Sequence, residues 1–189
     1  MATRFVELGH PVEAEFSIKL GMTGIVTTYL DSPFHRYPER ADLSSLPLEA
    51  VAGIPAMVLE SVGPKRHAVS VPFHDSQARG KAILIRTGWD ERWGTDAYWE
   101  PGPYLHEDLV FRLIRARVKL VGVDFPNIDD ADDPEKPAHT QLLAKDILIV
   151  EHMCNLKSAP KAGFKFYAVP LRILRGASCP VRAFGEITA

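Results

Sequence analysis

Residues 27–35 read TTYLDSPFH and bring an acid, a proline and a histidine into one short segment. Pro33 fixes its own φ near about −65°, and the residue before a proline favours an extended backbone. The segment is therefore typical of a strand that ends in a bend. Asp31 and His35 can then point into one cavity, where they could hold a metal or move a proton. On these residues alone, an acid that caps a turn and a histidine on a surface loop are the simpler interpretation.

Apolar runs on both sides of this segment predict an α/β protein. Runs rich in β-branched and other apolar residues, bounded by Gly, Pro and charges, favour buried strands. Apolar residues at helical spacing over residues 105–116 favour an amphipathic helix. Strands are expected at residues 4–8, 13–18, 25–30, 55–61, 81–86, 119–124, 147–150, 165–174 and 181–187, helices at 105–116 and 140–146, one helical turn at 44–49, and a helix N-cap at Asp75.

An acidic segment follows the expected strand at 119–124. Residues 129–135 contain four aspartates and a proline. Such a density of carboxylates could bind calcium, but the spacing and the glycine of an EF-hand loop are missing. A solvated loop is the favoured interpretation.

Aromatic residues crowd the segment 89–104, which holds Trp89, Trp93, Tyr98, Trp99 and Tyr104. Aromatic side chains at this density more often pack a loop or an interface than bind a ligand. An aromatic substrate would also suit them, and so would a dimer contact. These interpretations stay open.

Several sequence blocks follow one another along the chain: RFVELGHP at 4–11, LIRTGW at 84–89, WGTD at 93–96, VKLVGVD at 118–124, VPL at 169–171 and PVRA at 180–183. Together they resemble the cyclase family of metal-dependent hydrolases. The first block is similar to the family's opening strand, the next two to its central strand and loop, the fourth to the next buried strand and the last two to the closing strands. The length of 189 residues favours one domain over residues 1–189, which the resemblance makes cyclase-like. The resemblance also implies an α/β fold, with a mixed sheet curled into a barrel-like core and helices outside.

The family's metal-binding signature is half present in this chain. The signature reads His-x-Gly-Thr-His-x-Asp-x-Pro-x-His, and Ile25 and Tyr29 occupy the positions of the two leading histidines. Carried over residue by residue, the resemblance makes Asp31 a metal ligand and His35 the catalytic acid/base.

His139 and Glu151, twelve positions apart, resemble the pair that completes the family's metal site. Together with Asp31 they would offer one imidazole and two carboxylates, a donor set that suits Zn²⁺ or Mn²⁺. Three ligands are enough for one metal ion and argue against a pair of ions.

The resemblance implies a metal-dependent hydrolase of a small amide or cyclic amide, similar to arylformamidase. Metal-bound water would be the nucleophile and His35 the acid/base. The loss of two ligands at Ile25 and Tyr29 favours an alternative, a catalytically impaired relative that binds a small aromatic ligand or serves as a non-catalytic subunit. In a third interpretation, Tyr29 replaces metal chemistry by donating a hydrogen bond to an oxyanion.

Composition limits the partners that we expect. A net charge of −2 provides no basic face for nucleic acid or for an anionic membrane. No apolar run approaches the roughly 20 residues that span a bilayer, and the first residues show no apolar signal core. Cys154 and Cys179 lack metal-like spacing, which indicates reduced thiols. We expect a soluble, cytoplasmic protein with a small-molecule substrate, and the resemblance adds a homodimer or homotetramer.

Other polar residues receive structural interpretations. His10 and Asp124 end predicted strands and could support metal ligands, but structural hydrogen bonds are favoured for both. Arg86 is expected to form an internal salt bridge rather than bind a substrate carboxylate. Surface or packing roles are expected for His67, His74, His106 and His152.

Overall fold

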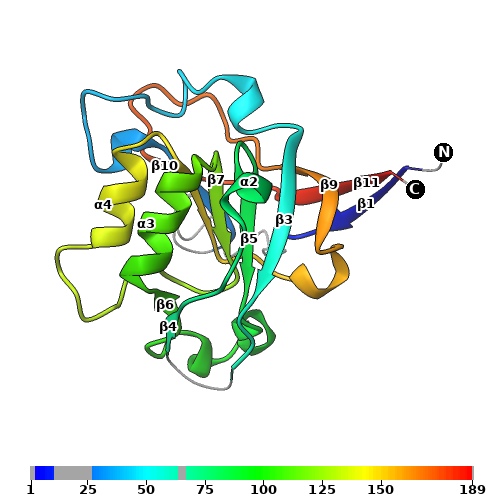
Figure 1. Ribbon diagram of the computed structural model, residues 1–189. Helices are drawn as coiled ribbons and strands as arrows, with labels where there is room; N and C mark the ends of the chain where they lie inside the picture. The colour runs from blue at the N-terminus through cyan, green and yellow to red at the C-terminus, as the bar shows by residue number, and fades with distance from the viewer. Residues whose placement is uncertain (1–2, 11–26, 64–66, 189) are drawn as a thin grey trace.

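The computed structural model describes residues 3–10, 27–63 and 67–188 (Figure 1). Its strands are β1 (Thr3–Glu7), β2 (Tyr29–Asp31), β3 (Ile54–Glu60), β4 (Ala68–Val69), β5 (Ala82–Arg86), β6 (Tyr104–Leu105), β7 (Leu120–Val123), β8 (Leu148–Glu151), β9 (Ala162–Tyr167), β10 (Ser178–Pro180) and β11 (Phe184–Thr188). The α-helices are α2 (Asp75–Ala78), α3 (Glu107–Ala116) and α4 (Pro137–Leu143). Short 3₁₀ turns are η1 (Pro33–His35), η2 (Leu48–Ala50), η3 (Trp89–Arg92), η4 (Asp96–Tyr98) and η5 (Leu156–Ser158).

The main sheet is mixed, which confirms the predicted α/β class. Within the described residues its strand order is β1-β11-β9-β3-β5-β7-β8-β2-β10, and β4 pairs with β6 in a separate small sheet. The central strands β3, β5, β7 and β8 are parallel. The strands on either side of them are antiparallel to their neighbours. This order does not confirm a closed barrel, and the barrel-like core stays a prediction.

The two innermost strands read as continuous apolar runs because both faces of a parallel sheet are covered. All four residues of β7 are buried, as are the first four of β5.

Gly122 in β7 allows the side chains of Met153 and Leu84 to lie close to the strand backbone. A Cβ atom at this position would lie 2.5 Å from Sδ of Met153 and 2.7 Å from Cδ2 of Leu84. A larger residue at Gly122 would therefore push its neighbours apart.

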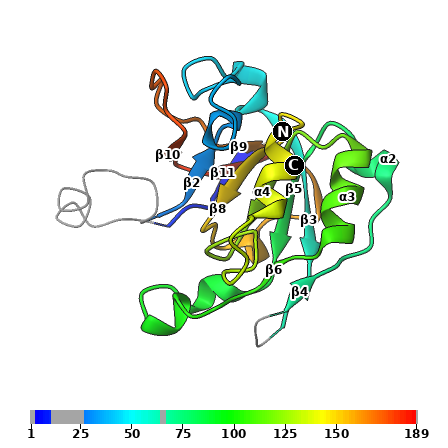
Figure 2. The same cartoon turned by 90° about the vertical axis from the view of Figure 1, so that its left-hand side faces the viewer.

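Alternating side chains of the central strands enter two separate cores. Ile83, Val121 and Ile149 belong to the core beneath α3 and α4, which cover one face of the sheet in Figures 1 and 2. The intervening side chains belong to the second core. That core also contains buried side chains from strands near both ends of the sheet order, namely Val6, Leu30, Phe166 and Cys179. Side chains from strands far apart in the sheet order therefore share this second core.

Helix α3 confirms the predicted amphipathic helix, with a later start. Leu105 belongs to β6, and His106 is the N-cap, whose side chain accepts a hydrogen bond from the Asp108 backbone N–H at 3.2 Å. Arg117 ends the helix in the left-handed conformation, at φ 56°. Of the helices in the described ranges, none is long and apolar enough to cross a membrane.

Several predicted boundaries were wrong. Asp75 is the first residue of α2 and His74 is its N-cap, so Asp75 is not the cap. Helix α4 begins at Pro137, because Lys136 breaks the preceding backbone at φ 50° and proline suits a first helical turn. The strand expected at 165–174 ends at Tyr167, and β10 was not predicted. The strand expected at 13–18, the start of the one at 25–30 and Ile25 lie outside the described residues.

Candidate metal centre

Asp31, His139 and Glu151 meet where β2, β8 and α4 come together. Within the described residues, one ligand atom from each side chain lies within 4.8 Å of the others, and all three residues are buried. The strand register explains part of this meeting. Tyr29 lies opposite Glu151 in the antiparallel β2–β8 pair, and residues two apart on a strand share a face. Asp31 therefore faces the same side as Glu151, and α4 adds His139.

One ligand atom from each of the three side chains points toward the others. Oδ2 of Asp31 is buried without a hydrogen-bond partner among the described residues. It lies 3.5 Å from Nε2 of His139, and Oε1 of Glu151 lies 3.6 Å from the same nitrogen. In a tetrahedral zinc site with ligands about 2.0 Å from the ion, neighbouring ligand atoms are roughly 3.3 Å apart. Two oxygens and one imidazole nitrogen at this separation fit a divalent ion.

The second oxygen of each carboxylate is held by a hydroxyl group. Ser178 Oγ donates a hydrogen bond to Oδ1 of Asp31, and Tyr29 Oη donates one to Oε2 of Glu151. The backbone N–H of Ile128 donates to Oε1 of Glu151 at 2.7 Å. Ser178 lies opposite Asp31 in the β10–β2 pair. Sequence reasoning missed Ser178 because β10 is three residues long, contains a proline and has no local pattern.

Asp129 orients the imidazole of His139. Its Oδ2 lies 2.6 Å from Nδ1 of His139, and its Oδ1 accepts the Ala138 backbone N–H at 2.6 Å. A carboxylate on one imidazole nitrogen directs the other nitrogen toward a metal. Asp129 is also buried, so the prediction of a solvated acidic loop is wrong at this residue. The signal available in the sequence was its place at the start of the acidic segment, ten positions before His139.

His139 and Glu151 shift each other's pKa within this centre. Burial by itself lowers the pKa of His139, but the charge of Glu151 and the hydrogen bond with Asp129 outweigh it and raise the pKa to about 10. Burial raises the pKa of Glu151 to about 7, although the nearby His139 acts in the opposite direction. Two buried carboxylates thus depend on positive charge between them, which a proton on His139 or a divalent ion can supply.

His35 lies at the open edge of the centre. Its Nδ1 is 4.0 Å from Oδ1 of Asp31 and 3.4 Å from Oγ of Ser178, and its side chain is 40% exposed. Burial lowers the pKa of His35, against the opposing charge of Asp31. The imidazole is therefore neutral near pH 7 and within reach of solvent, as a proton-transfer group must be.

Tyr29 does not have the hydrogen-bonding capacity for the oxyanion role considered above. A phenol has one proton to donate, and that of Tyr29 goes to Glu151. Burial raises the pKa of Tyr29 well above its usual value, so the hydroxyl keeps this proton.

An aromatic cluster adjoins the centre on the Tyr29 side. The His10 ring stacks on Trp93 at 3.8 Å between centroids, and the Tyr98 hydroxyl lies 2.8 Å from Nδ1 of His152. The His152 ring lies 5.4 Å from that of Tyr29. His152 is thus a packing residue. Nε2 of the His10 imidazole has no hydrogen-bond partner among the described residues, whereas the His10 backbone N–H donates to Thr28 Oγ1 at 3.0 Å.

Asp124 and Arg86 have the structural roles that the sequence favours. The carboxylate of Asp124 accepts hydrogen bonds from the backbone N–H groups of Thr87 and Gly88, each at 2.8 Å to Oδ2. It thereby fixes the turn after β5. Arg86 pairs with Glu60 at 2.8 Å across the neighbouring strands.

Comparison with known sequences matches residues 6–130 to the Cyclase family, described as "Putative cyclase". A kynurenine formamidase from Salinibacter ruber is 33% identical over 182 residues, which cover 90% of this chain and 81% of that protein. A kynurenine formamidase from Bacillus cereus is 29% identical over 185 residues, covering 94% and 84%.

Solved structures share the fold. An isatin hydrolase bound to the product analogue thioisatinate superposes with a TM-score of 0.76 at 20% identity, covering 88% of this chain and 74% of that one. Isatin hydrolase A from Ralstonia solanacearum gives 0.77 at 23% identity, covering 85% and 71%. A potential metal-dependent hydrolase with cyclase activity gives 0.75 at 18% identity and covers both chains fully.

Proposed function

Because this chain belongs to the cyclase family, we propose that it is a metal-dependent hydrolase of a small amide or cyclic amide. The observation that carries the proposal is the buried Oδ2 of Asp31, which has no hydrogen-bond partner among the described residues and faces Nε2 of His139. An unpartnered buried carboxylate oxygen is costly unless a ligand completes it. The nearby atoms, Nε2 of His139 and Oε1 of Glu151, are of the ligand types that divalent metals prefer.

Asp31, His139 and Glu151 would hold one Zn²⁺ or Mn²⁺ ion. When bound, such an ion polarises a carbonyl oxygen and lowers the pKa of a water molecule to about 7. Asp129 would keep Nε2 of His139 directed inward through its contact with Nδ1. The protein would thus provide a fixed, dry set of ligands.

His35 would move the proton. Hydrolysis of an amide removes a proton from the attacking water and delivers one to the departing nitrogen. A neutral imidazole at the open edge of the centre can accept the first proton and donate it to the leaving group. The contact with Ser178 would help to orient the ring.

An aryl group on the substrate is supported by two observations. The relatives above are named for kynurenine formamide and isatin, both aromatic amides. The half-exposed Trp99 belongs to the aromatic cluster beside Tyr29, and a flat ring could stack on it.

The test is to measure hydrolysis of two substrates, isatin and the formamide of kynurenine, by protein loaded with Zn²⁺ or Mn²⁺. We expect turnover of at least one substrate, and His35→Gln should lower kcat by about 100-fold, as expected for loss of a general acid/base. The matched control is His106→Gln, at the N-cap of α3 and outside the centre. Metal binding without turnover of either amide, but with binding of the aromatic compounds, would instead favour the non-catalytic alternative.

We further propose that the protein forms a homodimer or homotetramer. Exposed apolar side chains gather where the β9–β10 connection packs on residues 42–48, as Leu43 N–H donating to Gly176 O at 3.0 Å illustrates. They are Leu48, Val169, Leu171, Ile173 and Leu174. Apolar patches of this kind are typical of interfaces. Light scattering should give at least twice the chain mass of 21.0 kDa, and a mass of one chain would contradict the proposal.

A further inference from the structure

The two carboxylates of the metal centre are held in the same way, although they lie on different strands. Each has one oxygen bound by a side-chain hydroxyl, Ser178 on Asp31 and Tyr29 on Glu151. Each directs its other oxygen toward Nε2 of His139, at 3.5 Å and 3.6 Å. The hydroxyl groups thus occupy the outer oxygens and leave the inner ones for an ion.

The two inner oxygens differ in how much of their hydrogen-bonding capacity is used. Oε1 of Glu151 also accepts the backbone N–H of Ile128 at 2.7 Å, so one of its lone pairs is used. Oδ2 of Asp31 accepts no hydrogen bond from the described residues and approaches Nε2 of His139 at 3.5 Å. The side chains therefore present three single ligand atoms, two oxygens and one nitrogen.

Both hydroxyl groups are fixed by the sheet. Tyr29 lies directly opposite Glu151 in the β2–β8 register, and its ring packs against that of His152. Ser178 lies directly opposite Asp31 in the β10–β2 register. The ladder keeps each hydroxyl beside its carboxylate, and the hydrogen bond between them holds one carboxylate oxygen away from His139.

We propose that Tyr29 and Ser178 are positioning residues that restrict Glu151 and Asp31 to one ligand atom each, so that the centre selects one zinc ion over larger divalent ions. This inference rests on the proposed metal site and adds its selectivity. Zinc is satisfied by three protein ligands and one further ligand. Manganese prefers six oxygen-rich ligands, and a carboxylate that binds through both oxygens helps to supply them.

The hydroxyl groups of Tyr29 and Ser178 should raise the ratio of zinc affinity to manganese affinity. Tyr29→Phe removes the hydroxyl and keeps the ring, which frees Oε2 of Glu151 to turn inward. We expect the preference for zinc over manganese to fall at least about tenfold, mainly through tighter manganese binding. Affinities for Zn²⁺ and Mn²⁺ would be measured by competition with a chromophoric chelator. Ser178→Ala should change the ratio in the same direction and serves as a second variant if Tyr29→Phe does not fold.

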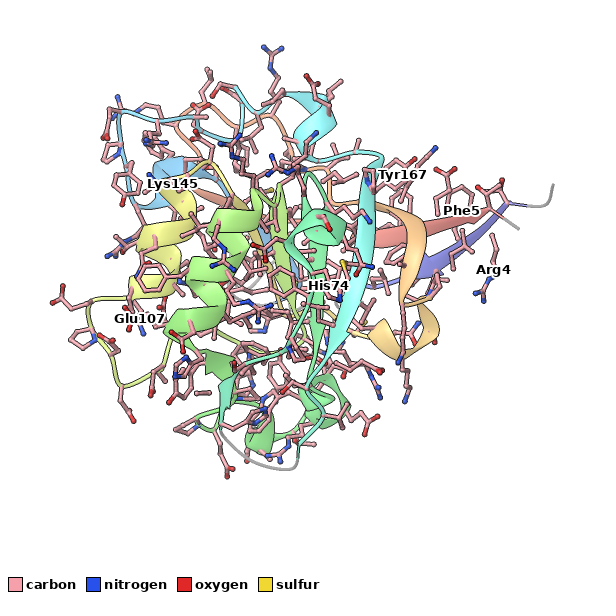
Figure 3. The ribbon with its side chains drawn as sticks, in the orientation of Figure 1. Arg4, Phe5, His74, Glu107, Lys145 and Tyr167 are labelled. Atoms are coloured by element: carbon pink, nitrogen blue, oxygen red, sulfur yellow. The ribbon has the colours of Figure 1, made fainter. Side chains whose placement is uncertain are left out.

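Tyr167→Phe is the matched control. Its hydroxyl also donates to a carboxylate oxygen, Oε2 of Glu186, but on the β9–β11 side of the sheet. Figure 3 shows Tyr167 at the end of β9, well away from α4, the helix that carries His139. The control should leave both affinities unchanged.

The outcomes separate the two proposals. An unchanged zinc-to-manganese ratio in both Tyr29→Phe and Ser178→Ala would overturn the positioning role, as would an equal loss of both affinities, since that indicates only structural damage. Failure of the unmodified protein to bind either ion would overturn the metal site itself, and the selectivity with it.

Discussion

Replacing Asp31 with asparagine is expected to abolish the response of the protein to metal. Asparagine keeps the shape of the side chain and an oxygen for Ser178, but it removes the charged oxygen that faces His139. Loss of a partner that only orients a ligand typically weakens metal binding by about 10–100-fold, so loss of a ligand should cost more than about 100-fold. With metal at 100 times its Kd, the unmodified protein should gain about 2.7 kcal/mol and melt roughly 5–10 °C higher.

Without metal, the same substitution should change the melting temperature far less than the loss of metal binding does. It removes the attraction between Asp31 and a protonated His139, 3.5 Å away, but it also relieves the repulsion between the buried charges of Asp31 and Glu151. Differential scanning calorimetry with and without Zn²⁺ measures both effects. Asp146→Asn is the control, because Asp146 is exposed, pairs with Arg40 at the surface and has a backbone that asparagine accepts. A full metal-induced shift in Asp31→Asn would exclude Asp31 as a ligand.

Truncating Ile83 to alanine is expected to cost about 3–4 kcal/mol of unfolding free energy. Ile83 is fully buried on β5, and it packs in the core beneath α3 and α4. Removing its methyl and methylene groups loses their transfer free energy and leaves a cavity that the surrounding strands cannot fill. For a chain of this size the melting temperature should fall by roughly 6–16 °C.

Urea unfolding at equilibrium measures this cost. Ile173→Ala is the matched control, because Ile173 is 39% exposed in the β9–β10 connection and should lose less than about 1 kcal/mol. A loss below about 1.5 kcal/mol for Ile83→Ala, with the m-value unchanged, would mean that the central strands are less tightly packed than described.

The fold was predictable where local patterns reflect burial. Residues 81–86 and 119–124 are apolar because both faces of the central parallel strands are covered, and β5 and β7 follow these ranges closely. The closing strands were harder to predict from local sequence patterns. β10 is held by pairing with β2, more than a hundred positions earlier, and no short stretch of sequence records such a partner. Helix α4 began early because Asp129 accepts its first N–H groups, a contact from outside the helix.

The sequence predicted the candidate ligands of the site but not the residues that hold those ligands in place. Asp31, His139 and Glu151 were proposed from a resemblance, and the structure places them together, while their binding of metal stays a proposal. Asp129 and Ser178 are short polar residues that look like ordinary loop or strand-end positions. Their roles come from single contacts across the fold, at His139 and Asp31. The segment that holds Ile25 is outside the described residues, so the half-signature is placed only from Thr27 onward.

The position of β2 between β8 and β10 has a consequence for the order of folding. Both of its neighbours come from the last quarter of the chain, so β2 can pair only after nearly all the intervening sequence has been brought back to it. Closing such long loops is slow, because entropy must be lost before the new contacts form. We therefore expect the candidate ligands on β2, β8 and α4 to come together late during folding. A metal ion bound by them would stabilise the folded chain rather than initiate its collapse.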